Sequence, residues 1–454
     1  MNTVRLKLIA AALVAATFPA SVWATNGYFT HGVSTAEKGL AGAGAAYSQD
    51  TLAAGNNPAG MVWQGKRYDI GIGVFAPMRS YTVTGGPTNQ CQGTNCTFSI
   101  GDGDTSIDSE NESFLIPSFG YNWMLDNDNS LGISVYGNGG MNTEYKGGEA
   151  TFFVPPPGPG AFLTFDGTFG DGTAGVDLAQ MFIATTYSSK LSPTSSWGIS
   201  GIIAYQRFEA KGLGNFAPFS TDPENLTNND HDTSTGIGLR VGYQAEISPG
   251  FRFGAAYQPK IQMSEFDDYA GLFAEDGDFD IPSTLSIGVS VDIGQDRMFI
   301  ADVQRINYED VASVSNNFEK LTSGCMPGSP TTGGTGDGCL GGSDGGGFGW
   351  ENIVIFKLGY QWTNEKNTWR LGYSKTDQPI PSSEVLFNIL APGVVREHIT
   401  FGFSRQLSSN SSIDFAAMYA PAEEVDGTSP FDPQQEIELE MDQYELVLSY
   451  NRRM

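Results

Sequence analysis

Hydrophobic and polar residues alternate along most of the chain from residue 67 onward. Between residues 236 and 247 the odd-numbered positions are apolar, whereas the even-numbered positions are glycines together with Arg240, Gln244 and Glu246. Residues 251–262 repeat this pattern. Because successive side chains of a strand point to opposite faces, each such segment predicts a β-strand with one apolar face and one face of small or polar residues.

Fourteen segments of this kind follow one another. They cover residues 67–76, 113–123, 130–141, 176–189, 196–211, 233–247, 251–265, 281–293, 297–308, 351–362, 367–376, 395–407, 411–419 and 436–452. The connections alternate between short turns, such as 248–250 and 294–296, and long loops. An even number of strands with short turns at one end and long loops at the other is typical of a transmembrane β-barrel whose termini both face the periplasm. The predicted fold class is therefore all-β, a 14-stranded antiparallel transmembrane β-barrel.

The polar face of the segments argues against other all-β folds. A soluble sandwich would carry Lys and Glu on its outer face, and a propeller would show internal repeats. Here the polar face is rich in Gly and Ser, which suits a barrel interior that must leave room for other atoms. Aromatic residues near segment ends, such as Trp123, Trp197 and Trp362, fit girdles at the membrane interfaces.

Residues 1–24 have the features of a secretory signal peptide. A basic start with Arg5 and Lys7 precedes an apolar run at 8–18, and we expect cleavage after Ala24. An N-terminal membrane anchor is the alternative, but the run is too short to span a bilayer and is interrupted by Pro19. No later run of about 18 apolar residues occurs, so the pattern excludes a helical membrane protein.

Residues 25–66 fit neither a strand nor a regular helix and are predicted to form a plug. The run from 39 to 46 is mostly Gly and Ala, which have little side chain to bury, so it can be ordered only inside something larger. Asn57, Pro58 and Ala59 then form a sharp exit turn. The predicted organisation is a signal peptide (1–24), an N-terminal plug (25–66) and an outer-membrane barrel (67–454).

The Gly/Ala run that ends in Asn57, Pro58 and Ala59 resembles the N-terminal hatch of the FadL/TodX family of outer-membrane transporters. The resemblance implies a barrel with the hatch inside its lumen, located in the outer membrane. It also implies passive transport of long-chain fatty acids or other hydrophobic molecules. Expected partners are the outer-membrane bilayer, such a hydrophobic molecule, and the outer-membrane assembly machinery. The chain departs from the barrel class at its end, where Met454 replaces the usual aromatic residue.

The third segment loses its alternation after Val135. It continues with a glycine-rich stretch: Gly137, Asn138, Gly139, Gly140 and Met141. Glycines inside a strand weaken pairing and mark bulges or kinks. In the FadL family the third strand kinks and opens the wall sideways, so the resemblance places a lateral opening at these residues. The alternative is a strand that simply ends in a Gly-rich loop.

Two long loops carry apolar residues that we expect to bind substrate. The residues are Leu213, Phe216, Phe219, Phe266, Leu272 and Phe273. In the family the corresponding loops form an apolar groove that first captures substrate, and exposed apolar clusters often mark a ligand surface. The alternative is mutual packing of the loops over the barrel mouth. A third apolar loop, 152–165, is read only as a stiff proline-rich cover.

Arg240 and Lys260 are the predicted partners for a substrate carboxylate. Both residues occupy positions of the alternating pattern that point into the barrel. Burying an unpaired carboxylate is costly, so a fatty acid inside the barrel would need such a cation. Ion pairs with other residues of the barrel interior are the alternative role for both.

Four cysteines fall in two polar loops of an exported chain, as Cys91 with Cys96 and Cys325 with Cys339. Two local disulfides are expected, since a zinc site would need a tighter group of Cys and His. We expect no metal and no cofactor. The net charge of −27 argues against a nucleic-acid partner.

No catalytic motif is recognised, so the chain is not expected to be an enzyme. Its three histidines have no serine elbow or similar partner. Two rival functions for a barrel remain. The long acidic loops could serve a non-transporting adhesin or phage receptor, and a general polar porin is disfavoured by the plug and the apolar loops.

Overall fold

The computed structural model describes residues 26–87, 98–101, 104–154 and 160–454. The predicted signal peptide and the predicted Cys91–Cys96 disulfide lie outside the described residues. Within those residues, no helix is both long and apolar enough to cross a membrane.

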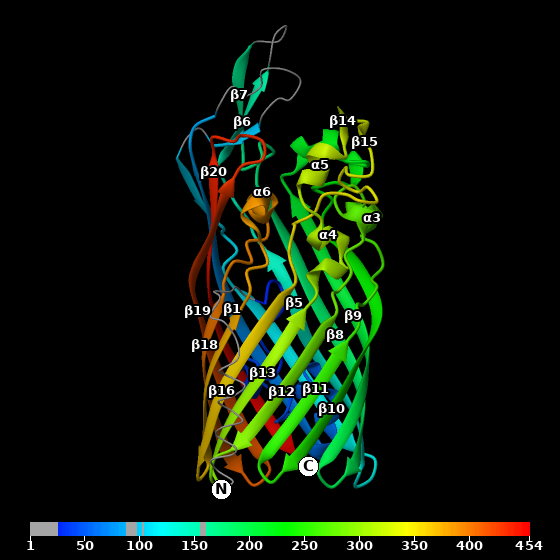
Figure 1. Ribbon diagram of the computed structural model, residues 1–454, viewed down its shortest axis with the longest axis vertical. Helices are drawn as coiled ribbons and strands as arrows, with labels where there is room; N and C mark the ends of the chain where they lie inside the picture. The colour runs from blue at the N-terminus through cyan, green and yellow to red at the C-terminus, as the bar shows by residue number, and fades with distance from the viewer. Residues whose placement is uncertain (1–25, 88–97, 102–103, 155–159) are drawn as a thin grey trace.

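Fourteen antiparallel strands close into a barrel, as predicted (Figure 1). They are β1 (Arg67–Thr84), β4 (Phe114–Met124), β5 (Asn129–Asn142), β8 (Gly175–Ser192), β9 (Ser195–Lys211), β10 (Asp232–Ser248), β11 (Phe251–Gln258), β12 (Thr284–Asp292), β13 (Arg297–Ile306), β16 (Ile353–Asn364), β17 (Asn367–Thr376), β18 (Glu397–Ser408), β19 (Ser411–Thr428) and β20 (Glu436–Arg453). Each pairs with its neighbour in sequence, and β20 pairs with β1 to close the sheet.

Three strands differ most in length from the prediction. β1 and β19 continue beyond residues 76 and 419, because both remain paired with β20 above the apolar part of the wall. There most outward residues are polar or acidic, so the hydrophobic alternation that marks a strand in lipid disappears. β11 ends at Gln258, because Pro259 has no backbone N–H to continue the ladder.

The remaining elements are short. The plug holds α2 (Thr35–Lys38), η1 (Thr51–Gly55) and η2 (Pro58–Trp63). The loop end of the barrel carries β2 (Phe98–Ile100), β3 (Thr105–Asp108), β6 (Glu149–Val154), β7 (Ala161–Asp166), η3 (Gly214–Phe219), η4 (Pro223–Asn225), η5 (Asp267–Tyr269), α3 (Ala274–Gly277), η6 (Tyr308–Asp310), α4 (Ala312–Ser315), α5 (Glu319–Ser323), β14 (Met326–Ser329), β15 (Gly333–Thr335), η7 (Ser382–Glu384) and α6 (Val385–Asn388). A disulfide joins Cys325 and Cys339 in this region.

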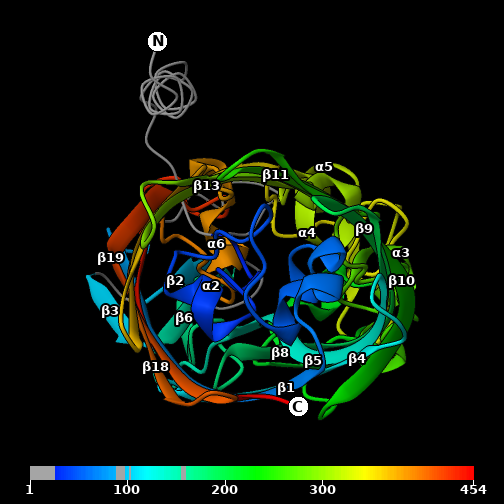
Figure 2. The ribbon, with the colours of Figure 1, turned by 90° about the horizontal axis from the view of Figure 1, so that it is seen from below.

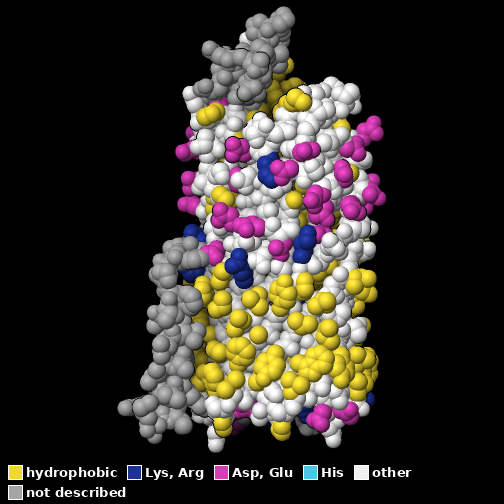
Figure 3. Space-filling view, turned by 45° about the vertical axis from the view of Figure 1, so that its right-hand side comes forward, with side chains coloured by type: hydrophobic (Ala, Val, Ile, Leu, Met, Phe, Trp, Pro, Cys, Tyr) yellow, Lys and Arg dark blue, Asp and Glu magenta, His cyan; other side chains and the backbone are white. Residues whose placement is uncertain are grey.

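The outside of the barrel carries a hydrophobic band, formed by the outward-facing apolar side chains of the strands (Figure 3). Ile237, Leu239 and Val241 of β10 belong to it and are exposed, as their parity predicts. Toward the short turns, aromatic pairs such as Trp362 with Trp369 border the band. Acidic side chains cover the surface above the band, toward the loops. This distribution matches a wall with lipid at its middle and water at its ends.

Residues 26–66 fill the lumen (Figure 2). The small residues of the plug are fully buried, including Ala43, Ala45 and Ala46. The wall opposite them is lined by glycines, because any larger residue would overlap the plug. A Cβ at Gly254 would collide with the Ala45 carbonyl, and one at Gly372 with the backbone of the plug at residues 40 and 41.

Inward-facing polar side chains of the wall satisfy the backbone of the plug. The carboxylate of Asp302 on β13 accepts hydrogen bonds from the amides of Gly44 (2.8 Å) and Ala45 (2.9 Å). Asp69 on β1 accepts from the amide of Thr51 at 2.8 Å. These bonds satisfy plug amides that have no partner within the plug, and they attach the plug to β13 and β1.

The same wall contacts involve the predicted exit turn. Asn57 caps η2 and donates through Nδ2 to the carbonyl of Tyr243 on β10 at 3.0 Å. The hydroxyl groups of Ser188 and Ser196 donate to the carbonyl of Ala59, at 3.0 and 2.7 Å. The motif therefore fixes the plug to three strands, β8, β9 and β10.

These contacts predict that Gly254→Val displaces the plug without unfolding the barrel. The valine side chain cannot coexist with the Ala45 carbonyl, whereas the strand itself tolerates valine. We expect trypsin to cleave after Lys38, which is buried in the parent, and the single-channel conductance to rise. Gly201→Val is the control, because its Cβ would meet nothing within 4 Å. An uncleaved plug and parental conductance in Gly254→Val would contradict the prediction.

Candidate functional site

The pairing between β4 and β5 ends part-way up the wall. Their ladder runs from Met124 and Ser130 to Phe119 and Val135 and then stops. β4 stays paired with β1 up to Phe114, and β5 stays paired with β8 up to Asn142. Residues 114–118 of β4 and 136–142 of β5 are therefore not paired with each other. We call this interruption the window.

The sequence of both strands accounts for the window. β5 has a bulge against β8 between Gly137 and Gly139, which shifts its register and bends the strand. On the opposite side, β4 carries Pro117, which has no backbone N–H and is tolerated in a sheet where a partner is missing. The glycine-rich stretch predicted to weaken the third strand is thus the stretch where pairing with β4 is absent.

The window lies at the height of the hydrophobic band. Leu115 of β4 pairs with Val74 of β1, which in turn pairs with Leu446 of β20, and all three side chains are exposed on the outside. Above the window, the amide of Glu110 donates to the carbonyl of Glu144 at 2.8 Å and closes its upper rim. The window is therefore bounded above and below and lies within the apolar part of the wall.

The start of the plug lies against the open edge of β5. Phe29 forms an isolated antiparallel bridge with Gly139. The amide of Gly140 donates to the carbonyl of Tyr28 at 2.9 Å, and the amide of Thr30 donates to the carbonyl of Asn138 at 3.0 Å. Hydrogen bonds that β5 cannot make with β4 are made with the plug instead.

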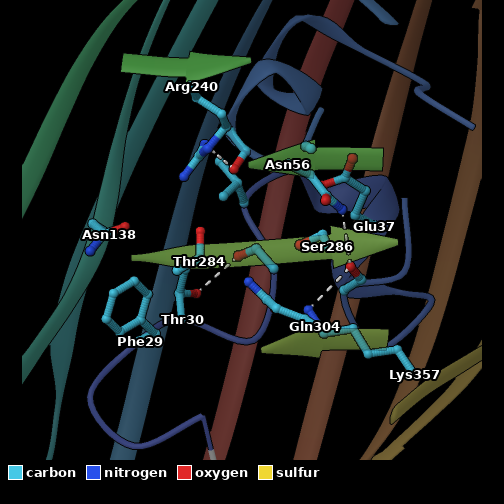
Figure 4. Close-up of a pocket in the computed structure, with 15 residues that line it drawn as sticks. Phe29, Thr30, Glu37, Asn56, Asn138, Arg240, Thr284, Ser286, Gln304 and Lys357 are labelled. Carbon is cyan, nitrogen blue, oxygen red and sulfur yellow. Dashed lines mark hydrogen bonds between the residues drawn. The ribbon is translucent and has the colours of Figure 1, made fainter. Parts of the chain in front are cut away.

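A small cavity lies between the plug and the wall (Figure 4). Its volume is about 40 Å³, and its lining includes Phe29, Glu37, Asn138, Arg240 and Lys357. One water molecule needs ~10–15 Å³ of such volume, so the cavity holds a few waters and no alkyl chain. With the plug in this position, the lumen has no room there for a hydrophobic solute.

The two predicted cations have different partners. The guanidinium of Arg240 donates to the carbonyl of Gly55 in the plug, to the Tyr136 hydroxyl at 3.1 Å and to Oε1 of Gln258 at 2.7 Å. All of these acceptors are neutral. Lys260 instead forms an ion pair with the buried carboxylate of Asp280 at 2.6 Å. The structure therefore places only Arg240 at the cavity, and Lys260 is neutralised in a loop.

The charged groups that hold the plug were not among the predicted site residues. Lys38 of α2 pairs with Glu445 of β20, and His31 approaches the same carboxylate at 3.3 Å. Lys357 of β16 donates to the carbonyl of His31 at 3.2 Å. Inward parity identifies Glu445 and Asp302 as acidic residues of the barrel interior, but only the folded plug shows what they bind.

The six predicted loop residues belong to one loop cluster, the contiguous set of buried apolar side chains at the loop end of the barrel. Leu213, Phe216, Phe266 and Phe273 are buried, and Phe219 and Leu272 are partly buried. The structure brings Phe216 into ring contact with loop residues Phe98, Phe169 and Phe387. The rings that surround Phe273 are those of Phe208, Phe266 and Phe279. In this conformation the loops pack on one another.

Comparison with known proteins shows which structures share this fold. No family model and no curated protein sequence matches the chain. The Pseudomonas putida toluene transporter TodX superimposes with a TM-score of 0.63, at 16% identity, over 94% of this chain and 99% of its own. A Pseudomonas aeruginosa FadL homologue superimposes with a TM-score of 0.62 at 15% identity, over 94% of this chain and 99% of its own. The Ralstonia pickettii toluene transporter TbuX superimposes with a TM-score of 0.58 at 16% identity, over 93% of this chain and 99% of its own. These matches confirm the predicted resemblance at the level of the fold.

The loop that holds Lys260 and Asp280 has a pH-sensitive carboxyl. Burial and the neighbouring carboxylate of Asp280 raise the pKa of Asp278 to about 7. An unfolded Asp ionises near pH ~3.9. Between these values the folded loop holds a proton that the unfolded loop lacks, so loop stability decreases as the pH rises from about 4 to about 7 and is constant above.

We therefore expect amide exchange in residues 266–280, corrected for intrinsic rates, to be faster at pH 8 than at pH 4.5. Asp278→Asn should remove this difference, because the asparagine does not titrate. The exposed neighbour Asp276 provides the control variant, Asp276→Asn, which should behave like the parent. If Asp278→Asn retains the full pH dependence, the assignment to Asp278 is wrong.

Proposed function

We propose that this chain, which has the fold of the FadL and TodX transporters, is an outer-membrane channel for long-chain fatty acids or other hydrophobic molecules. In this proposal the molecules move by passive diffusion and leave through the window between β4 and β5. The observation that carries the proposal is the missing β4–β5 pairing at the height of the hydrophobic band, beside a lumen that the plug fills.

The position of the window suits an apolar solute. Burial of apolar surface is worth about 25 cal/mol per Å², so a hydrocarbon gains free energy when it moves from the loops into lipid. A route along the barrel axis would instead pass the plug and the polar groups that hold it. Sideways exit keeps the solute in apolar surroundings, with Ile116 of β4 and Gly137 of β5 at the rim.

The apolar loops are the proposed point of first contact with the substrate. Phe219 and Leu272 lie at the partly buried margin of the loop cluster, where a hydrophobic molecule could join the packing. A fatty acid carboxylate would pair with Arg240, whose hydrogen bonds in the described structure go only to neutral oxygen atoms.

The proposal also includes location and orientation. The hydrophobic band would lie in the outer membrane, and the short turns would face the periplasm. The amide of Met454 donates to the carbonyl of Lys66 at 2.9 Å, so the end of the barrel and the exit of the plug lie together at the turn end (Figure 1). Both termini of the barrel domain would then be periplasmic, where the assembly machinery acts. The proposed activity is transport and involves no catalysis.

Closing the window should stop transport. In Gly137→Val the new side chain would lie against Ile116 of β4, across the window, so we expect uptake of a labelled fatty acid by cells to fall several-fold. Binding of the same molecule to purified protein should persist, because the loops are unchanged. Gly201→Val serves again as the outward-facing control.

Normal uptake through a Gly137→Val barrel in which the valine is shown to lie against Ile116 would refute lateral exit. Solutes would then have to pass the plug. If the parent protein neither binds nor transports any fatty acid or hydrocarbon, the adhesin or phage-receptor function is the better account.

The loop residues can be tested separately. Replacing Phe216, Phe219 and Phe273 together with Ser should weaken binding of a long-chain fatty acid, because these rings supply apolar contact area. Each buried ring lost from a core costs about 3–5 kcal/mol, but the strand ladder is untouched, so the barrel should remain folded and heat-modifiable on gels. Parental affinity in the triple variant would show that these rings only pack the loops.

A further inference from the structure

We propose that the apolar face of the small sheet β2–β6–β7 is an outer capture site for uncharged hydrophobic molecules or for the hydrocarbon part of amphipathic ones. The sheet stands at the outermost part of the loop end (Figure 1). The inference rests on the proposed transport function and adds a first binding site that lies apart from the two loops considered above.

Strand register assigns one face of this sheet to apolar residues. Phe98 of β2 lies opposite Phe152 of β6, which lies opposite Leu163 of β7. The next row has the same character, since Ile100 lies opposite Ala150, which lies opposite Phe165. Residues directly opposite one another in an antiparallel pair share a face. The face is therefore two rows deep and three strands wide.

Burial of this face decreases from one strand to the next. On β2, Phe98 is 8% exposed and Ile100 is 1% exposed, because loops of the barrel cover them. Phe152 of β6 is partly buried. On β7, Leu163 is 40% and Phe165 is 47% exposed. The apolar face thus extends one strand beyond the loops that cover it, and the open part is continuous with a buried one.

The open part leads directly into the loop cluster. The ring centroids of Phe165 and Phe152 are 5.6 Å apart, and those of Phe152 and Phe98 are 5.2 Å apart. The ring of Phe98 in turn packs on that of Phe216 within the loop cluster, with 6.1 Å between the ring centroids. A molecule bound against Leu163 and Phe165 would therefore remain in contact with apolar side chains on its way inward. Dispersed exposed residues would lack this continuity.

Size and charge favour a small apolar ligand over a protein partner. A stable protein interface buries about 800 Å² on each side, far more than two half-exposed side chains offer. Within the described strands, the proposed face carries no charged side chain, because Glu149 and Asp166 lie opposite one another on the other face of the sheet. A face without charged groups offers no partner to a polar headgroup, so the hydrocarbon part of a molecule is the part that fits it.

The test compares two identical substitutions on opposite faces of β7. Phe165→Ser removes a ring from the proposed site, whereas Phe162→Ser removes an equally exposed ring (41%) from the other face. Binding of a labelled long-chain fatty acid and of toluene would be measured in nanodiscs, together with uptake by cells at limiting and saturating concentrations. Leu163→Ser is a second variant of the same face.

We expect Phe165→Ser and Leu163→Ser to raise the concentration for half-maximal uptake roughly threefold to tenfold, as loss of apolar contact area implies, with little change in maximal rate. Phe162→Ser should match the parent. Equal effects of Phe162→Ser and Phe165→Ser, or no effect of either, would overturn the proposal while leaving the transport function intact. A change of oligomeric state in Phe165→Ser, measured by light scattering, would also overturn it and assign the face to contact between copies. Failure of the parent to bind either probe would instead refute the transport function itself.

Discussion

The structure depends on satisfying the backbone of a plug whose central run, residues 39–46, is mostly Gly and Ala. A segment of Gly and Ala has little side chain to bury, so the amides and carbonyls that are not paired within it need partners from outside. The wall supplies them through Asp302, Asp69, Ser188 and Ser196, and inward glycines such as Gly254 keep the wall close enough for these bonds. Small residues are thus needed on both the plug and the wall, because both must allow the two backbones to approach closely.

The same requirement explains how an interrupted wall is tolerated. A closed barrel leaves no strand edge in the membrane, and the window breaks that rule, because β5 loses β4 as a partner beyond Val135. Tyr28 and Thr30 of the plug provide replacement hydrogen bonds at Gly140 and Asn138. The interruption of strand pairing and the position of the plug are therefore coupled through one short length of backbone.

Local pattern was sufficient to predict the barrel, because parity is a property of each strand by itself. The alternation around Ile237 and Arg240 correctly separated the outer from the inner face, and glycine at the inner face correctly indicated a filled lumen. What depends on contacts between distant segments could not be read in this way. Nothing in the residues around Phe216 distinguishes an exposed groove from loops packed on one another, and Lys260 gives no sign by itself that Asp280 neutralises it. The extension of β1 and β19 was missed because strands above the membrane have no apolar face to mark them.

The ion pair between Lys38 and Glu445 joins residues 407 positions apart in the chain. Asp302, which holds Gly44 and Ala45, is likewise more than half the chain away from them. Contacts between such distant residues form late in folding, because a large loop must close first. We therefore expect the plug, although it precedes the barrel in the chain, to acquire its structure only after β20 pairs with β1. The Gly/Ala run has almost no large hydrophobic side chains, so the plug cannot fold alone. For the same reason, this run has little tendency to aggregate before the barrel closes.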